Sequence, residues 1–124
     1  MNRCVLTLLL ALVVALPAQA QRLFDRNALR GELVVTTPPA ALLNGKPARL
    51  APGARIRNAQ NLLQLSGAIV DQKLLVHYTL DGFGQIQNVW ILNEAEAARR
   101  PWPTSPEEAA RWSFDPTQQV WVKP

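Results

Sequence analysis

Apolar and polar residues alternate most regularly in two neighbouring segments, residues 73–80 and 85–92. A period of two is typical of a strand that buries one face. Between the two segments lies a glycine-flanked loop, Asp81-Gly82-Phe83-Gly84, so the segments are predicted to form a hairpin. Its apolar face is expected to hold Leu74, Val76, Tyr78 and Leu80 from the first strand and Ile86, Trp90 and Leu92 from the second.

Shorter apolar segments earlier in the chain predict further strands: residues 29–37, two half-strands within residues 40–50, residues 54–57 and residues 62–65. Asn44-Gly45 separates the two half-strands. This pair is the strongest signal for a two-residue hairpin, because both positions of a type I′ turn need positive φ. Pro47 lacks an N–H, which predicts an edge position for the second half-strand. Pro52-Gly53 predicts a turn before residues 54–57.

The last part of the chain, residues 94–124, is rich in proline and aromatic residues. Residues 94–100 would form a short helix at most. Ser105-Pro106-Glu107-Glu108 is a complete helix start, because serine caps the N-terminus, proline fits the first turn and carboxylates favour the positive end of the dipole. This helix is predicted to end near Trp112, and residues 119–122 are a candidate last strand.

These elements predict an all-β domain, a small curled sheet or barrel of OB or SH3-like type with about five to six short strands. The barrel would span residues 29–93 and follow a lead-in segment, residues 21–28. A proline- and tryptophan-rich tail with one short helix, residues 94–124, would complete the chain.

The tail carries three tryptophans, at positions 102, 112 and 121. Aromatic surface left in water is unfavourable, so packing of the tail across the barrel is the favoured expectation. The alternative is that the tail docks on a partner, in which case Trp102, Trp112 and Trp121 are candidate binding residues.

The first 20 residues have the pattern of a secretory signal peptide. Arg3 supplies a positive charge, an apolar run of about a dozen residues follows, and Ala18-Gln19-Ala20 is a small-x-small cleavage site. Cleavage after Ala20 is therefore expected. A run of this length is too short to span a bilayer. No apolar run follows it, so no transmembrane segment would remain after cleavage. This form of signal suggests the bacterial periplasm.

Residue types that carry catalysis or bind metals are scarce. The only cysteine, Cys4, lies in the signal, and His77 is the only histidine. Disulfides, a thiol nucleophile and a zinc site of Cys and His ligands are therefore excluded from the exported part. His77 lies mid-strand with no nucleophile at a suitable spacing, so we expect a surface or edge residue rather than a catalytic base. No catalytic residue, metal or cofactor is expected.

Positive charge is concentrated in the first half of the domain. Residues 22–57 hold seven basic and two acidic side chains, whereas residues 58–124 hold five basic and seven acidic ones. Arg49, Arg55 and Arg57 flank the predicted Pro52-Gly53 turn, which could fold Arg49 back beside the other two. Such a cluster would attract an anionic partner. The simpler alternative is that these charges keep strand edges soluble.

The stretches ALLNGKPARLAPGARIR and NLLQLSGAIVDQKLLVHYTLDGFGQIQNVWIL resemble uncharacterised small exported proteins of β-proteobacteria. The resemblance covers residues 41–92 and implies no activity, ligand or catalytic residue.

We interpret the chain as a non-catalytic periplasmic protein that acts as a binding or assembly accessory. Its partner would be an envelope protein or an anionic molecule. Nucleic acid is not expected as a partner, because export removes the usual ones, and the protein is expected to be a monomer. Two alternatives remain open at this point: a cell-envelope enzyme that uses His77, and a structural envelope protein.

Overall fold

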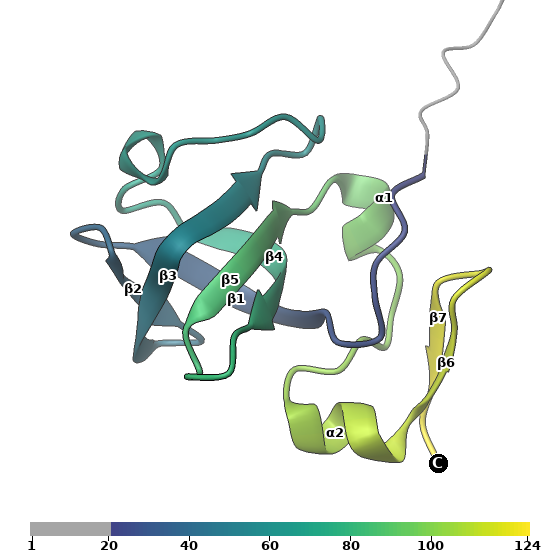
Figure 1. Ribbon diagram of the computed structural model, residues 1–124. Helices are drawn as coiled ribbons and strands as arrows, with labels where there is room; N and C mark the ends of the chain where they lie inside the picture. Colours follow the sequence, from purple (N-terminus) through teal and green to yellow (C-terminus); the bar gives the residue numbers. More distant parts are fainter. Residues whose placement is uncertain (1–20) are drawn as a thin grey trace, which may run out of the picture.

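Five strands form a closed barrel in the computed structural model of the chain, which describes residues 21–124 (Figure 1). The expectation of a small all-β barrel is confirmed. The predicted signal peptide, residues 1–20, lies outside the described residues. The barrel strands are β1 (Leu29–Val35), β2 (Ala40–Leu43), β3 (Lys46–Arg57), β4 (Leu74–Leu80) and β5 (Ile86–Ile91).

The strand order around the barrel is β1-β2-β3-β5-β4, with β4 pairing back onto β1. All neighbours are antiparallel except β3 and β5, which are parallel. This order, with one parallel pair, is that of an OB-type barrel. The segment between β3 and β4 therefore crosses one end of the barrel as a long connection, residues 58–73.

The predicted Asn44-Gly45 turn is confirmed, with positive φ at both residues, 53° and 79°. The edge position predicted at Pro47 is confirmed locally, since residues 46–49 of β3 pair with β2 alone and pairing with β5 begins at Leu50. Pro47 lies opposite Leu42, one position from the pair that closes the turn. At such a position the backbone N–H site points away from the hairpin partner, so proline removes no bond between β2 and β3.

The predicted turn at Pro52-Gly53 is wrong, because β3 runs through it without interruption. The pairing of β3 with β5 instead shifts register between Leu50 and Arg55, which marks a β-bulge. Gly53 has a φ of +77° inside this irregularity. Glycine takes up such a φ without strain, so here the Pro-Gly pair bends a strand and does not end it.

A second register shift explains why the apolar face of β5 was assigned wrongly. Thr79 pairs with Asn88 but Leu80 pairs with Ile86, so Gln87 is an extra residue in β5. Beyond this bulge, inward and outward positions are exchanged. Val89 therefore enters the barrel core while Trp90 points out of it, contrary to the period-two prediction. Leu92 lies with Trp90, whereas Tyr78 is inside the barrel as predicted.

The core of the barrel consists of buried aliphatic side chains and one tyrosine. Its members are Leu29, Leu33, Val35, Ala41, Leu50, Ile56, Ile69, Val76, Tyr78, Ile86 and Val89. Residues 62–65, predicted to be a short strand, do not form one. Leu63 makes a single bridge to Arg57, and a 3₁₀ turn, η1 (Ser66–Ala68), follows.

The tail folds into two short helices and a small hairpin, where one helix and one strand were expected. These are α1 (Glu94–Ala97), α2 (Pro106–Arg111), β6 (Ser113–Asp115) and β7 (Val120–Val122). The predicted start of α2 is confirmed, since the Ser105 side chain accepts a hydrogen bond from the Glu108 N–H at 3.3 Å. Among residues 21–124, no helix combines the length and the apolar character needed to span a bilayer.

The tail packs on the outside of the barrel and forms a second core there, as expected from its aromatic residues. Phe24, Ala28, Trp102 and Trp121 are its buried members. Trp90 and Leu92 from the barrel side, and Ala109, Trp112 and Phe114 from the tail, pack around them. The β4–β5 side of the barrel is thus covered on both faces.

Candidate functional site

His77, the only histidine, lies on the outer side of β4 beneath the tail and is 1% exposed. The expectation of a surface or edge residue is wrong. Trp102 stacks on the imidazole at 4.1 Å between ring centroids, and Phe24 meets it edge-on at 4.4 Å. Burial, together with the nearby charges of Arg30 and Arg22, lowers the pKa of His77 to about 3. The ring is therefore neutral at any ordinary pH.

The single hydrogen bond found for this ring within residues 21–124 comes from Arg30, whose Nε–H donates to His77 Nε2 at 3.2 Å. Nε2 must then be the unprotonated nitrogen, which puts the proton on Nδ1. The Arg30 guanidinium also donates to the backbone carbonyls of Glu96 and Arg99, both at 2.8 Å. A cation at the C-terminus of α1 suits the helix dipole. Arg30 and His77 thus join the barrel to α1.

The three tail tryptophans differ in what they offer to a partner. Trp102 and Trp121 are buried in the second core, and the Trp102 indole N–H donates to the Ala28 carbonyl at 2.8 Å. Trp112 is half-buried, with the Lys123 ammonium 5.2 Å from its ring centroid. Trp102 and Trp121 therefore present no free ring face in this structure.

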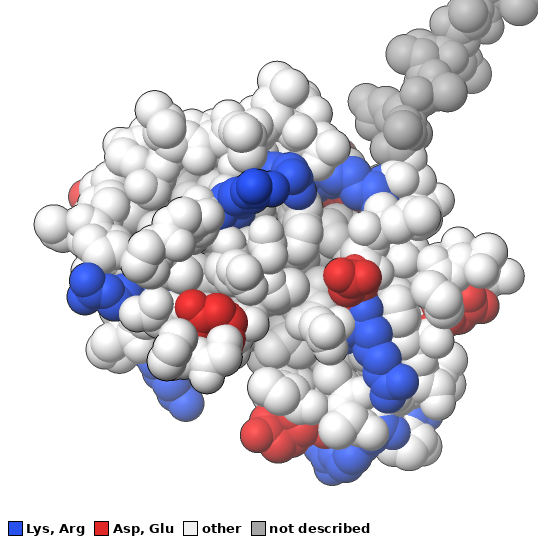
Figure 2. All heavy atoms as spheres, in the orientation of Figure 1, with Lys and Arg blue, Asp and Glu red and all other residues white. Residues whose placement is uncertain are grey.

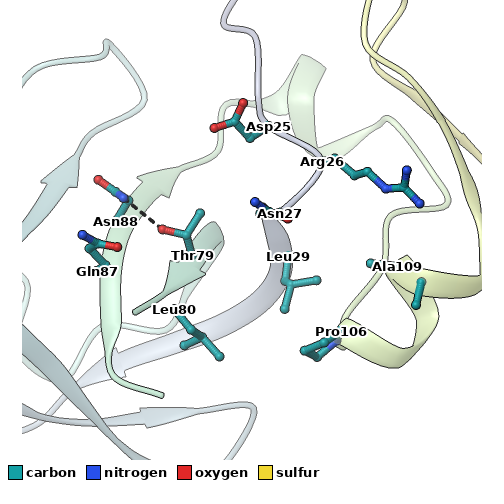
Figure 3. Close-up of a pocket in the computed structure, with 11 residues that line it drawn as sticks. Asp25, Arg26, Asn27, Leu29, Thr79, Leu80, Gln87, Asn88, Pro106 and Ala109 are labelled. Carbon is teal, nitrogen blue, oxygen red and sulfur yellow. Dashed lines mark hydrogen bonds between the residues drawn. The ribbon is translucent and has the colours of Figure 1, made fainter. Parts of the chain in front are cut away.

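A groove of about 560 Å³ runs between the barrel and α2 (Figure 3). The side chain of Arg26 points away from Asp25 and toward α2. Asn88 Nδ2 donates to Thr79 Oγ1 at 2.9 Å, so two polar side chains of the groove already bind each other. Asn27 of the lead-in segment adds a further polar group, and α2 contributes mainly apolar side chains. The remaining lining residues are Leu29, Leu80 and Gln87 on the barrel side and Pro106, Ala109 and Ala110 on α2.

A wider groove, about 810 Å³, lies beside α1. Its central charged groups, Arg22 and Glu96, form an ion pair with each other. Arg22 also donates to the carbonyls of Asn58 and Ile91, at 2.9 and 2.8 Å. These contacts tie the lead-in segment to the barrel and leave neither charge free for a ligand. Residues 21–124 hold no cluster of His, Cys, Asp and Glu that could bind a metal ion.

The three arginines proposed as a cluster all lie on β3. Arg49 lies before the irregular stretch at Pro52-Gly53, opposite Ala40 of β2, whereas Arg55 and Arg57 follow that stretch and pair with β5. Convergence of all three on one surface therefore stays a prediction. Lys and Arg atoms form several separate groups in Figure 2, one of them over the C-terminal end of β3.

Arg55 and Arg57 lie on one face, on either side of the buried Ile56. The segment after β3 folds back along them, because Arg57 bridges Leu63 in antiparallel register and the Gln64 N–H donates to the Ile56 carbonyl at 2.8 Å. Only Arg57 and Leu63 form a bridge, and Leu65 lies two residues further on, beside the groove lined by Ala54 and Ile56. Bridged residues of antiparallel segments point to the same side, so Leu63 shares the face of Arg57 and Arg55.

We call Arg55, Arg57, Leu63 and Leu65 the basic–apolar surface. Leu63 and Leu65 are 73% and 81% exposed, which is high for leucine. Sequence reasoning missed both leucines, because it treated residues 62–65 only as another short strand. Two adjacent leucines, at 62 and 63, cannot both face the core of a period-two strand, and that was the available signal.

No protein-family model, no curated protein and no solved structure matches this chain. The resemblance to exported proteins of β-proteobacteria therefore stays a prediction, and the function must be argued from the geometry of the chain itself.

Proposed function

We propose that this chain is an exported, non-catalytic binding or assembly accessory protein of the bacterial periplasm. In this proposal the basic–apolar surface holds a partner in the cell envelope. The observation that carries it is the bridge between Arg57 and Leu63, which sets a cation beside an exposed leucine. Exposed apolar side chains gathered on one surface are typical of interaction sites. Unpaired cations beside them favour an anionic partner.

The alternative of an enzyme that uses His77 receives no support from the geometry. A general base must come within hydrogen-bond reach of the proton that it removes. His77 lies under Trp102 and Phe24, and its Nε2 is already held by Arg30. A pKa of about 3 would also make it a very weak base at neutral pH. We expect that His77→Gln leaves function intact in any assay in which the variant stays folded.

Retention on envelope material tests the proposed function. The exported protein would be incubated with washed envelopes, which contain both lipid and protein, and then sedimented. We expect the wild type to be retained and the variant Arg55→Gln/Arg57→Gln/Leu63→Asn/Leu65→Asn to stay in solution. The four side chains lie on the surface, so circular dichroism and the melting temperature should be little changed. Equal retention of the variant and the wild type would refute the proposal.

Export itself is tested by the intact mass of the protein recovered from the periplasm. We expect the mass of a chain whose first residue is Gln21, because a small-x-small cleavage site lies directly before it. A retained Met1, or recovery only from the cytoplasm, would contradict the proposed location.

A further inference from the structure

The two cations of the basic–apolar surface are unpaired within the part of the chain that the structure describes. Neither Arg55 nor Arg57 has an ion-pair or side-chain hydrogen-bond partner there, whereas Arg22 and Arg30 are fully engaged. Residues 33–70 contain four basic side chains and no acidic one. The positive potential around this surface is therefore not neutralised by neighbours along the chain, and an anionic partner would complement it.

The loop that carries the leucines is rigidly held. Asn58 Oδ1 accepts from the N–H groups of Gln60 and Leu62, both at 3.0 Å, and the Asn58 N–H donates to the Leu62 carbonyl at 2.8 Å. These bonds fix the backbone on which Leu63 and Leu65 are displayed. A partner would therefore bind this arrangement with little loss of backbone entropy.

The chemistry of residues 58–73 favours a lipid surface over a protein groove. Residues 58–70 contain no charged side chain, so this stretch could enter the headgroup region without dehydrating an ion. The segment runs across one end of the barrel, beyond the C-terminal end of β3 (Figure 1). Exposed leucines beside unpaired cations match the acyl chains and phosphates that meet at the boundary of an anionic leaflet.

We propose that the basic–apolar surface docks reversibly on an anionic phospholipid bilayer. Leu63 and Leu65 enter the boundary between headgroups and acyl chains, and Arg55 and Arg57 bind lipid phosphates. This inference rests on the proposed function, since it names the partner of the same surface. It differs from insertion of a spanning segment, because two leucines and two cations give only a weak and salt-sensitive attachment.

Vesicle sedimentation tests the inference. The exported protein is mixed with vesicles of phosphatidylglycerol or of phosphatidylcholine, and the bound fraction is measured against lipid concentration at low and high salt. We expect phosphatidylglycerol to bind roughly thirtyfold more tightly, from two arginines near an anionic surface. Arg55→Gln/Arg57→Gln should lose that preference. Leu63→Asn/Leu65→Asn should weaken binding by about tenfold even at high salt, because the leucine contribution is not screened.

Matched controls lie on the same chain. Lys46→Gln/Arg49→Gln removes the same charge from the other end of β3, and Phe83→Asn removes an apolar side chain that is 93% exposed at the β4–β5 turn. Both controls should bind like the wild type. An equal loss with Lys46→Gln/Arg49→Gln would overturn the proposal and place the contact on the β2–β3 face. Equal binding to both lipids would overturn it as well.

The two proposals fail in different ways. If phosphatidylglycerol vesicles do not bind, but delipidated envelope proteins still retain the wild type and not the four-residue variant, the lipid inference is wrong and the proposed function stands. If washed envelopes retain the four-residue variant as well as the wild type, the proposed function is wrong.

Discussion

The imidazole of His77 stacks on the indole of Trp102, with ring centroids 4.1 Å apart and ring planes inclined by 25°. His77 belongs to a barrel strand and Trp102 to the tail, so this stack is a joint between the two parts of the domain. The indole N–H of Trp102 donates to Ala28 at the end of the lead-in segment, which brings a third part of the chain into the joint.

The first prediction is that stability falls as the pH is lowered through the unfolded-state pKa of His77. The folded-state pKa is depressed to about 3, so below pH 6.5 the unfolded chain binds a proton that the folded chain does not. The free energy of unfolding should therefore drop by about 2 kcal/mol between pH 7.5 and pH 5 because of this residue. Urea titrations of the wild type and of His77→Gln, which cannot titrate, measure the difference. Parallel pH profiles would contradict the assignment.

The second prediction separates two buried tryptophans. Trp102 Nε1–H is hydrogen-bonded, whereas Trp121 Nε1 has no partner among the described residues. Trp102→Phe leaves the Ala28 carbonyl unpaired, while Trp121→Phe removes an unsatisfied donor. Both changes lose similar volume, so Trp102→Phe should cost about 1–2 kcal/mol more than Trp121→Phe. Chemical denaturation measures the free energy of unfolding of both variants. A larger loss for Trp121→Phe than for Trp102→Phe would show that the Trp121 indole N–H has a partner in solution.

The joint between barrel and tail also marks the limit of what the sequence could predict. The alternation in residues 73–80 identified β4, because Val76 and Tyr78 do face the barrel core. It wrongly placed His77 at the surface. A period of two is taken to mean that the strand's outer face is exposed to solvent, but here the tail covers that outer face. Nothing local in the sequence around His77 reports that residues 94–124 fold back over it.

Bulges account for the other errors. A single extra residue at Gln87 reverses the inward and outward positions beyond it, which is why Trp90 was assigned to the wrong core. Likewise, a Pro-Gly pair is usually read as a turn, and only the pairing of β3 with β5 shows that the strand continues. The Asn44-Gly45 turn and the Ser105 cap were predictable because their geometry depends on a few adjacent residues.

The third prediction concerns Arg30, which is 8% exposed and bonds His77 and the carbonyls at the end of α1. Arg30→Met keeps the apolar stem but leaves these buried acceptors without donors. It should lower the free energy of unfolding by about 3 kcal/mol. Arg26→Met is the matched control, because Arg26 is exposed, and it should change stability by less than about 0.5 kcal/mol. Urea denaturation compares the two, and similar midpoints would show that the Arg30 contacts are not formed.

The fourth prediction tests whether Gly53 is a bulge residue inside one continuous strand. Its φ is +77°, and an added Cβ would meet nothing within 4 Å, so any cost of Gly53→Ala comes from the backbone conformation alone. We expect a loss of about 1 kcal/mol, the usual penalty for an L-residue in the left-handed region. Gly82→Ala is the control, because Gly82 has equally open surroundings without a positive φ, and it should be neutral or slightly stabilising. Thermal denaturation of both variants gives the comparison. If Gly53→Ala is as harmless as Gly82→Ala, the backbone at Gly53 does not adopt this conformation in solution.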